Sequence, residues 1–353
     1  MGLPVVCLAL VGWQAAPPES LREAAQHSGM LMGAAARPGQ LSEAAYAATL
    51  AREFNMLEPE DALKWETLRP DAQSFDFRQG DQLVEFARRH NMKVRGHTLV
   101  WHHQNPAWLT AGKFTASQLS QLLETHIKTV VGHYRGKVFA WDVANEAFDE
   151  GGRSGQLRST IWSDQPGIGY AGQGARYLAQ CFRWAHEADP DALLFYNEAE
   201  AEEMNRKSDA VYAVVRELRR EGVPIDGVGL QMHLSTVPDV ASISANIARF
   251  TELGLQVHIT EMDVSLPVDG SGRASGADLQ KQADLYGQIA EACLSHRGCT
   301  AIQTWGFTDK YSWIGSHSKK TRGAALPFDS NYQPKSAYQA LRNALMKGRQ
   351  AHR

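Results

Sequence analysis

The chain alternates short, apolar, strand-prone runs with longer stretches of helical periodicity, and the alternation continues over most of its length. Eight such runs begin near residues 31, 55, 93, 138, 193, 227, 256 and 301. Consecutive parallel strands need a crossover connection, usually a helix, and such crossovers are right-handed. Eight β-then-α units in succession favour a barrel that closes on itself over an open sheet. We therefore predict an α/β fold, a single (β/α)8 TIM barrel.

The segment from Thr115 to Gly136 illustrates the helices that lie between these runs. Thr115 and Gln118 have the spacing of a capping box, in which each side chain binds the backbone N–H of the other residue. Leucine and valine residues follow at helical intervals as far as Tyr134, and Gly136 is suited to end a helix. We expect a helix that begins after Thr115 and ends near Gly136.

The length and composition are those of one large domain. The 353 residues are 43% hydrophobic, which is enough for a sizeable core, and a single barrel reaches this length. We assign residues 19–347 to the barrel domain, which would carry any catalytic site, and residues 348–353 to a C-terminal tail. No linker, tandem repeat or low-complexity tract divides the chain.

Residues 1–18 have two interpretations. The segment LPVVCLALVGWQAAPPES resembles the apolar core of a secretion signal followed by small residues, but no Lys or Arg precedes it. The segment is therefore either a signal peptide or a disordered N-terminal tail. A signal peptide would make the protein secreted or periplasmic, which is the localisation that we expect.

Charge and hydropathy exclude two classes of partner. The net charge is −3, and Lys and Arg are scattered, so no basic patch for nucleic acid is evident. No apolar run approaches the roughly 18 residues that a membrane-spanning helix needs. We expect no nucleic-acid partner and no membrane span. We also expect a monomer, although no sequence feature decides the oligomeric state.

The chain has four cysteines, Cys7, Cys181, Cys293 and Cys299. Cys293 and Cys299 flank a short loop where a predicted helix ends and a strand begins. A disulfide between them is one interpretation and would fit an oxidising compartment. Two unrelated buried thiols are the second interpretation. No second Cys or His pair has zinc spacing, which argues against a metal site built on these cysteines.

Polar and aromatic residues collect at the C-terminal ends of the predicted strands, where barrel enzymes have their active sites. In chain order they are Glu58, Glu60, Asp61, Lys64, His97, Trp101, His102, His103, Gln104, Asn145, Glu146, Asn197, Glu198, Glu200, Gln231, His233, Glu261, Asp263, Trp305 and Trp313. This concentration at one edge of the barrel predicts a site there.

Two carboxylates, Glu146 and Glu261, each end an apolar run. On the later run, Val257, Ile259, Glu261 and Asp263 share one face by period-2 alternation. Each Glu could anchor a loop or pair with a Lys or Arg. Two acids at one barrel mouth instead fit glycoside hydrolysis, in which a protonated acid donates to the leaving oxygen and the other attacks or activates water. Since burial penalises charge, we expect the pKa of Glu146 to be raised.

The histidines do not form an evident metal site. His97 and His233 could be ligands, but no His-x-His motif opens the first strand run, as it does in metal-dependent barrel hydrolases. His102 and His103 are adjacent and would point to opposite faces of a strand, which suits chelation poorly. We predict neither a metal nor another cofactor.

The tryptophans near these strand ends suit a sugar. Sugar rings present apolar faces to indole, while their hydroxyl groups seek Asn, Gln and His. We assign Trp101, Trp305 and Trp313 to such contacts, with plain packing as the competing interpretation. Trp141 and Trp184 are assigned to the core.

Seven ordered motifs extend the pattern: FNMLEPEDALKWE, GHTLVWHHQNPAW, WDVANE, GLQMHL, VHITEMD, TWGFTDKYSWI and FDSNYQPKSAY. With these motifs the chain resembles family 10 glycoside hydrolases, the retaining endo-β-1,4-xylanases, from about Leu21 to about Leu345. The resemblance implies a (β/α)8 barrel without a cofactor that hydrolyses internal β-1,4-xylosidic bonds of xylan or xylo-oligosaccharides. It also implies double displacement through a covalent glycosyl-enzyme intermediate.

The resemblance implies a role for each matching residue. Glu146 corresponds to the acid/base and Glu261 to the nucleophile. Asn145 corresponds to the residue that binds the sugar hydroxyl beside the reacting carbon. Other matches are His233, which holds the nucleophile, Asp263, which supports His233, Gln231 at the reaction centre, and Trp305 and Trp313 as cleft walls. Glu60, Lys64, His97, Trp101 and Gln104 match residues that line the sugar sites toward the non-reducing end.

Three residues depart from the family pattern. Asp61 stands where the family usually has Asn, Ala199 replaces a Tyr that supports the leaving-group sugar, and Glu200 replaces an Asn. These changes leave open a preference for short xylo-oligosaccharides or aryl glycosides over polymer. A xylan-binding protein without activity and a metal-dependent hydrolase are competing hypotheses. Tolerance of side-chain decorations is not decided by the sequence.

Overall fold

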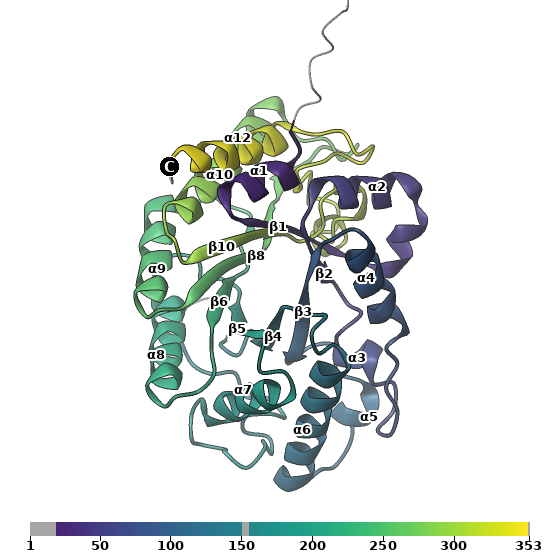
Figure 1. The fold of residues 1–353 in the computed structure, drawn as a ribbon, viewed down its shortest axis with the longest axis vertical. Coiled ribbons are helices and arrows are strands. Elements are labelled where there is room, and N and C mark those ends of the chain that lie inside the picture. Colours follow the sequence, from purple (N-terminus) through teal and green to yellow (C-terminus); the bar gives the residue numbers. More distant parts are fainter. Residues whose placement is uncertain (1–18, 150–154, 352–353) are drawn as a thin grey trace, which may run out of the picture.

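The computed structural model describes residues 19–149 and 155–351, so the predicted signal peptide or N-terminal tail lies outside the described residues. Eight parallel strands close into a barrel in the order β10-β1-β2-β3-β4-β5-β6-β8, and β10 pairs again with β8 (Figure 1). The strands are β1 (Leu31–Ala36), β2 (Met56–Pro59), β3 (Lys93–Val100), β4 (Ala140–Asn145), β5 (Leu193–Glu198), β6 (Gly227–Leu230), β8 (Gln256–Val264) and β10 (Cys299–Thr304). Each overlaps one of the predicted runs, and the predicted barrel is confirmed.

Helices surround the barrel and connect its strands (Figure 1). The longer ones are α1 (Leu21–Ser28), α2 (Ala44–Glu53), α4 (Arg78–Arg89), α6 (Ala116–His133), α7 (Arg176–Ala188), α8 (Arg206–Arg220), α9 (Val240–Glu252), α10 (Gly276–Leu294) and α12 (Ser336–Ala351). Short helical turns are α3 (Trp65–Leu68), α5 (Ala107–Thr110), α11 (Ile314–His317), η1 (Pro38–Ser42) and η2 (Asp309–Tyr311).

The start of α6 agrees with its sequence signal. The Thr115 hydroxyl accepts from the backbone N–H of Gln118 at 3.3 Å, and Gln118 Oε1 accepts from the backbone N–H of Thr115 at 2.9 Å. The helix ends at His133, slightly earlier than predicted. Gly136 lies in the following turn with φ +71°, where its N–H donates to Asp189 Oδ2 at 3.1 Å. Gly136 is therefore the turn residue that was predicted, but the helix ends three residues before it.

Helix α12 packs against α1 and α10 (Figure 1). It continues to Ala351 and so includes the first residues of the segment predicted as a C-terminal tail. The physical reason is close packing: a Cβ on Gly348 would lie 2.9 Å from Leu294 Cδ2, and Lys347 pairs with Glu291 at 2.8 Å. These contacts extend the helix beyond the point where the apolar pattern ends.

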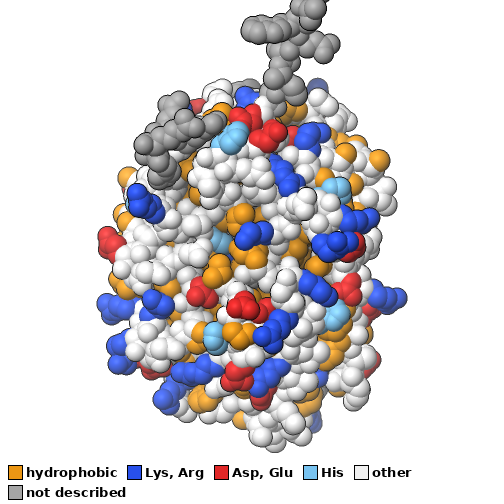
Figure 2. Space-filling model, viewed as in Figure 1, with side chains coloured by type: hydrophobic (Ala, Val, Ile, Leu, Met, Phe, Trp, Pro, Cys, Tyr) orange, Lys and Arg blue, Asp and Glu red, His pale blue; other side chains and the backbone are white. Residues whose placement is uncertain are grey.

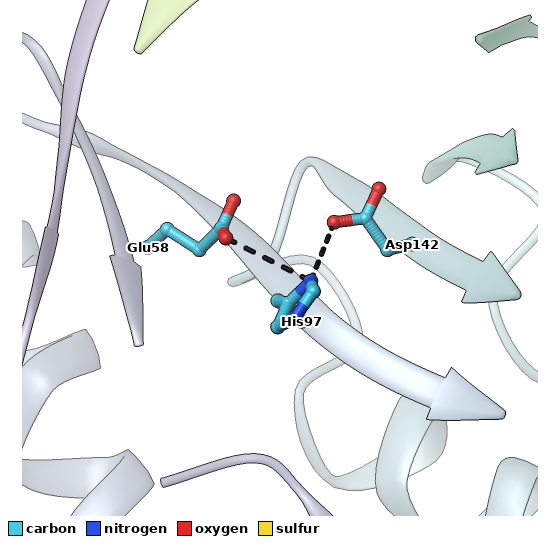
Figure 3. A group of neighbouring side chains, drawn as sticks. All are labelled: Glu58, His97 and Asp142. Carbon is cyan, nitrogen blue, oxygen red and sulfur yellow. Dashed lines mark hydrogen bonds and ion pairs between the residues drawn. The ribbon is translucent and has the colours of Figure 1, made fainter. Parts of the chain in front are cut away.

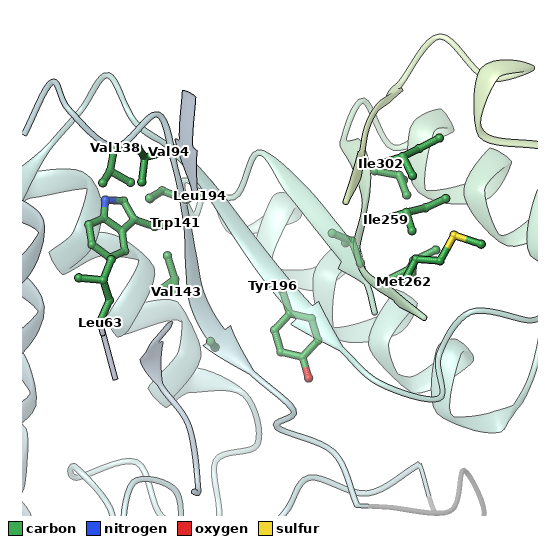
Figure 4. Close-up of a cluster of buried hydrophobic side chains, with 14 of the residues drawn as sticks. Leu63, Val94, Val138, Trp141, Val143, Leu194, Tyr196, Ile259, Met262 and Ile302 are labelled. Atoms are coloured by element: carbon green, nitrogen blue, oxygen red, sulfur yellow. The ribbon is translucent and has the colours of Figure 1, made fainter. Parts of the chain in front are cut away.

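Apolar side chains fill the space around the strands, as Figure 4 shows for Trp141, Leu194 and Ile302. Trp141 is fully buried and lies over Gly96 on the neighbouring strand β3. A Cβ at Gly96 would come within 2.3 Å of the Trp141 ring, so this position requires glycine. The contact holds β3 and β4 together, and their ends carry part of the site.

A disulfide joins Cys293 at the end of α10 to Cys299 at the start of β10, with 5.3 Å between their Cα atoms. The disulfide interpretation of this loop is confirmed. Cys181 is a buried free thiol.

The surface carries both signs of charge. On the face that Figure 2 shows, Lys and Arg side chains alternate with Asp and Glu, and neither sign forms a continuous patch. Among the described helices, none combines the length and apolar character that crossing a membrane requires.

Candidate active site

A cleft with a volume of about 650 Å³ opens where the strands end. It brings together most of the predicted site residues, which come from the ends of six barrel strands or the loops after them. Those that line it are Lys64, His97, Trp101, Asn145, Glu146, Gln231, His233, Glu261, Asp263, Trp305 and Trp313. Because parallel strands in a barrel all end at the same edge, residues far apart in sequence converge there.

Glu146 follows the last residue of β4 and has φ +52°, in the left-handed region that a non-glycine residue rarely occupies. The turn after it is held by β5. The backbone N–H of Ala147 donates to the Tyr196 hydroxyl at 3.1 Å, and that of Phe148 donates to Glu198 Oε2 at 3.3 Å. The Tyr196 hydroxyl in turn donates to Glu198. This strained backbone persists because its neighbours hold it.

The Glu146 carboxylate accepts hydrogen bonds from two neutral donors. Trp101 Nε1 donates to Oε2 at 2.8 Å, and Gln231 Nε2 donates to Oε1 at 2.9 Å. Burial raises the pKa of Glu146, but the bonds from Gln231 and Trp101, together with the nearby His102 and His97, oppose it, and the net pKa is lowered. The predicted rise in the Glu146 pKa is therefore wrong, because the donors stabilise the carboxylate.

The Glu261 carboxylate, within β8, faces a different set of partners. Asn197 Nδ2 donates to Oε1 at 2.7 Å, and His233 Nε2 lies 3.0 Å from Oε2. His233, in the short strand β7 (His233–Leu234), also has Nδ1 2.8 Å from Asp263 Oδ2. Burial lowers the His233 pKa, but Asp263 and then Glu261 outweigh it, and the pKa is raised well above 6.5. Each ring nitrogen of His233 thus faces a carboxylate, an arrangement that favours the imidazolium form, which donates to both.

Amide groups connect the two carboxylates. Asn197 Nδ2 donates to Glu261 and also to Asn145 Oδ1 at 2.9 Å. Gln231 Nε2 donates to Glu146 and also reaches Asn145 Oδ1 at 3.2 Å. Asn197 was recognised from the sequence only as one polar residue near the strand ends, and the polar side chain within an apolar strand was its signal.

The polar residues after β2 form an ion-pair network. Lys64 Nζ lies 2.8 Å from Gln104 Oε1 and 3.3 Å from Asp61 Oδ1. Arg37 pairs with Glu60 Oε1 at 2.7 Å and with Asp61 Oδ2 at 3.0 Å. Glu60 and Gln104, predicted to line the sugar sites, belong to this network together with Lys64, which lines the cleft. Arg37 had no sequence signal.

Beneath the cleft, Glu58, His97 and Asp142 converge, as Figure 3 shows. His97 Nδ1 lies 3.0 Å from Asp142 Oδ2, and Arg95 Nε lies 3.1 Å from the same oxygen and 3.4 Å from Glu58. Burial raises the pKa of Glu58 to about 8. The Arg95 guanidinium already supplies the positive charge that a divalent ion would bring, which disfavours a metal at these three residues.

His102 and His103 do not point to opposite faces. Their ring centroids are 3.9 Å apart, because β3 ends at Val100 and strand alternation no longer applies. Burial lowers the His102 pKa to about 4. The expectation of opposite orientation was wrong, and the cause is the strand boundary.

The wall of the cleft also includes Ala199 and Glu200, both after β5. Lys207 lies nearby and pairs with the buried Glu198 at 3.0 Å. The departures from the family pattern at residues 199 and 200 therefore face the cleft.

The geometry defines a class of enzyme. Two carboxylates with different hydrogen-bond partners, in an indole-walled cleft at the end of a (β/α)8 barrel, are typical of barrel glycoside hydrolases. Residues 20–344 match the sequence model of Glycosyl hydrolase family 10, and the chain belongs to this family. The resemblance inferred from the seven motifs is confirmed, and the chain is a glycoside hydrolase.

Named relatives cover most of the chain. Endo-1,4-beta-xylanase B of Thermotoga neapolitana is 46% identical over 301 residues, which are 85% of this chain and 83% of the relative. The crystal structure of native xylanase 10B from Thermotoga maritima superposes with a TM-score of 0.87 at 44% identity, covering 94% of this chain and 99% of that one. Xylanase 10B from Thermotoga petrophila RKU-1, in complex with xylobiose, gives 0.88 at 43% identity, with 95% and 99% covered.

Proposed function

We propose that this chain is a retaining endo-1,4-β-xylanase that cleaves internal β-1,4-xylosidic bonds of xylan by double displacement. The similarity to xylanases supports the substrate, and the complex of one of them with xylobiose supports binding of xylose units in the cleft. The mechanism rests on the two carboxylates. We derive each step from the contacts around them.

The observation that carries the proposal is the asymmetry between the two acids. The His233 imidazolium beside Glu261 stabilises negative charge there, as a nucleophile requires. The described hydrogen-bond donors to Glu146, Trp101 and Gln231, are neutral, so no cation is bonded directly to its carboxylate. Retention requires about 5 to 5.5 Å between the two carboxyl groups.

In the first step, a Glu261 oxygen attacks the anomeric carbon, the bond to the leaving sugar breaks, and the Glu146 proton passes to the leaving oxygen. This step requires a protonated Glu146, whereas the hydrogen bonds from Trp101 and Gln231 favour its carboxylate. A sugar ring in the cleft excludes water from Glu146, and desolvation raises its pKa.

In the second step, a water attacks the same carbon and gives its proton to Glu146, while the ester bond to Glu261 breaks. Esterification has by then removed the negative charge of Glu261, so the Glu146 carboxylate can form more easily. Asn145 is held by the amides of Asn197 and Gln231, which leaves its own NH2 group to donate to a sugar hydroxyl. Trp305 and Trp313 present indole rings to the sugar faces.

A product time course on xylan, with the anomeric configuration read by NMR, tests the proposal. We expect β-configured reducing ends to form first and mutarotate later, with internal cleavage producing a range of oligosaccharides. First appearance of the α-anomer would replace double displacement by direct inversion. Unchanged rates in EDTA would separate this mechanism from that of a metal-dependent hydrolase, and the release of any reducing sugar excludes a protein that only binds xylan.

A preference for short substrates is a second candidate, favoured by the methyl side chain of Ala199 in the cleft wall. A small residue there gives a leaving-group sugar less contact area than an aromatic ring would. The ratio of activity on xylan to activity on xylotriose measures this preference. We expect Ala199→Tyr to raise that ratio, and an unchanged ratio would remove the candidate.

We further propose export from the cytoplasm, supported by the Cys293–Cys299 disulfide, since such bonds persist in oxidising compartments. A reporter fused behind the N-terminal segment tests the proposal, because export with cleavage is expected. Retention of the reporter in the cytoplasm would contradict it.

A further inference from the structure

Arg322 is held at the cleft wall by its backbone and by its side chain. It belongs to β11 (Arg322–Gly323), which pairs antiparallel with β9 (Leu266–Pro267). Its backbone N–H donates to Ser318 Oγ at 3.1 Å, and the same hydroxyl donates to its carbonyl oxygen at 3.1 Å. The side chain lines the same cleft as Glu146 and Glu261. Its position is therefore fixed before any ligand binds.

The hydrogen bonds of the guanidinium orient it without using all of its donors. Nε donates to Ser265 Oγ at 2.9 Å, and Nη2 donates to the carbonyl oxygens of Ser235, at 2.7 Å, and of Ser265. A guanidinium has five N–H donors in a fixed plane. Within residues 19–149 and 155–351, the two donors on Nη1 have no hydrogen-bond partner. They remain for a ligand.

The charge of Arg322 is also uncompensated within that part of the chain. Lys64 pairs with Asp61 at 3.3 Å, and Lys207 pairs with Glu198 at 3.0 Å. The partners of Arg322, by contrast, are two carbonyl oxygens and one hydroxyl, and no described carboxylate lies within ion-pair distance. An unpaired guanidinium in a binding cleft is suited to an anionic group of the ligand.

The barrel order places Arg322 at one end of the cleft. Lys64 and Trp101 follow β2 and β3, which lie across the ring of eight strands from β6 and β8. Arg322 is bound to Ser235 and Ser265, which follow β7 and β8. Since Lys64 and Trp101 match the residues at the non-reducing-end sugar sites, Arg322 belongs to the end where the leaving group lies.

There is room for a side group beside Arg322. A second hollow, of about 1160 Å³, is also lined by Arg322, together with Lys320, Asn331, Asp269 and Asp329. Arg322 lines both spaces, so a substituent that branches beside Arg322 from a chain in the cleft would lie next to this hollow. There Lys320 adds positive charge, and the amide and carboxylate oxygens can accept from sugar hydroxyls.

We propose that Arg322 binds the carboxylate of a uronic acid side group carried by the xylan chain at the leaving-group end, through its Nη1 donors. The inference rests on the proposed xylanase function and adds a preference for acidic decoration to it. The xylose backbone is uncharged, so it gives no reason for an unpaired cation. A carboxylate on a side sugar does, because its oxygens can accept from the two Nη1 donors.

The test compares glucuronoxylan with the same polymer after reduction of its carboxyl groups, so that only the charge differs. In the unaltered enzyme we expect glucuronoxylan to be cleaved roughly fivefold faster than the reduced polymer at low substrate concentration. This ratio should fall to about one in Arg322→Gln, keep an intermediate value in Arg322→Lys, and shrink with added salt. The fragments released on the leaving side should carry the uronic acid close to their new non-reducing end.

Two controls separate this role from others. Lys347→Gln makes the same charge change on α12, far from the cleft, and should leave the ratio unchanged. Hydrolysis of xylohexaose, which has no side group, should be little altered in Arg322→Gln. The melting temperature of this variant shows whether its fold is intact. An unchanged ratio in Arg322→Gln, or an equal loss on all three substrates, overturns the inference. Failure of the unaltered enzyme on xylohexaose would instead overturn the proposed function.

Discussion

Glu146 and Glu261 face one cleft, yet their backbones and their neighbours differ. Glu261 lies within the regular strand β8, and its carboxylate contacts an imidazolium, His233. Glu146 lies one residue beyond β4 with a left-handed φ, and its carboxylate contacts the neutral donors Trp101 and Gln231. The strand fixes one acid, and a network of side chains from β5 fixes the other.

This comparison shows that burial alone does not decide the protonation of an acid. Burial raises the pKa of Glu58 to about 8 and that of Glu198 to about 7, even though cations lie beside both. Glu146 is also removed from bulk water, but its two hydrogen-bond donors, together with the nearby His102 and His97, oppose burial, and the net pKa is lowered. The acid proposed to carry the reaction's proton is thus the one whose charge state a bound sugar can change.

The largest expected effect is on Glu261→Gln, which keeps the shape of the side chain but removes the nucleophile. We expect a loss of at least about 10⁴-fold in kcat on both xylan and aryl xylosides, because no covalent intermediate can form. Steady-state rates measure this, with Glu53→Gln as control, since Glu53 is a buried carboxylate of α2 outside the cleft. Turnover near that of the control would remove Glu261 from the mechanism.

Glu146→Gln sharpens the comparison because its effect should depend on the leaving group. On xylan, whose leaving oxygen needs a proton, we expect a loss of about 10² to 10⁴-fold. An aryl xyloside with a good leaving group should keep a fast first step, visible as a burst of released phenol, because that oxygen departs without a proton. Equal losses on both substrates would contradict the acid role.

A smaller effect is expected for Tyr196→Phe. The variant loses the hydroxyl that accepts from Ala147 N–H, so the turn that holds Glu146 loosens. We expect roughly tenfold lower kcat on xylan with little change in KM, and less effect on an activated aryl xyloside. Tyr286→Phe is the control, because its buried hydroxyl donates to the Ala325 carbonyl at 2.9 Å, away from Glu146. A similar substrate dependence in both variants would mean a general loss of stability.

Much of the fold could be predicted from the sequence, because each barrel strand must be buried and therefore appears as an apolar run. Boundaries were less certain, as the continuation of α12 to Ala351 shows, since they depend on tertiary packing such as that of Gly348 against Leu294. The positions of Glu146 and Glu261 at strand ends were likewise readable from the pattern of apolar residues before each of them.

The surroundings of those residues were not predictable in the same way. The pKa of Glu146 depends on Trp101, 45 residues away, and on Gln231, 85 residues away. Alternation along one strand carries no information about such partners. The same holds for the pair between Arg37 and Glu60, which are 23 residues apart.

The smallest expected effect concerns stability and isolates the cation beside Glu261. The folded pKa of His233 is raised well above the value of 6.5 taken for the unfolded chain, mainly because Asp263 outweighs burial. Its stabilising contribution is therefore complete below about pH 6.5 and is lost as pH rises through the folded pKa.

Between pH 6 and pH 9 the melting temperature of the unaltered enzyme should fall by about 1 to 2 °C more than that of His233→Asn. Glu58 and Glu198 contribute the same trend to both proteins, so only the difference reports His233. Parallel curves would mean that His233 is not charged in the folded enzyme, and the electrostatic contrast between the two acids would then be lost.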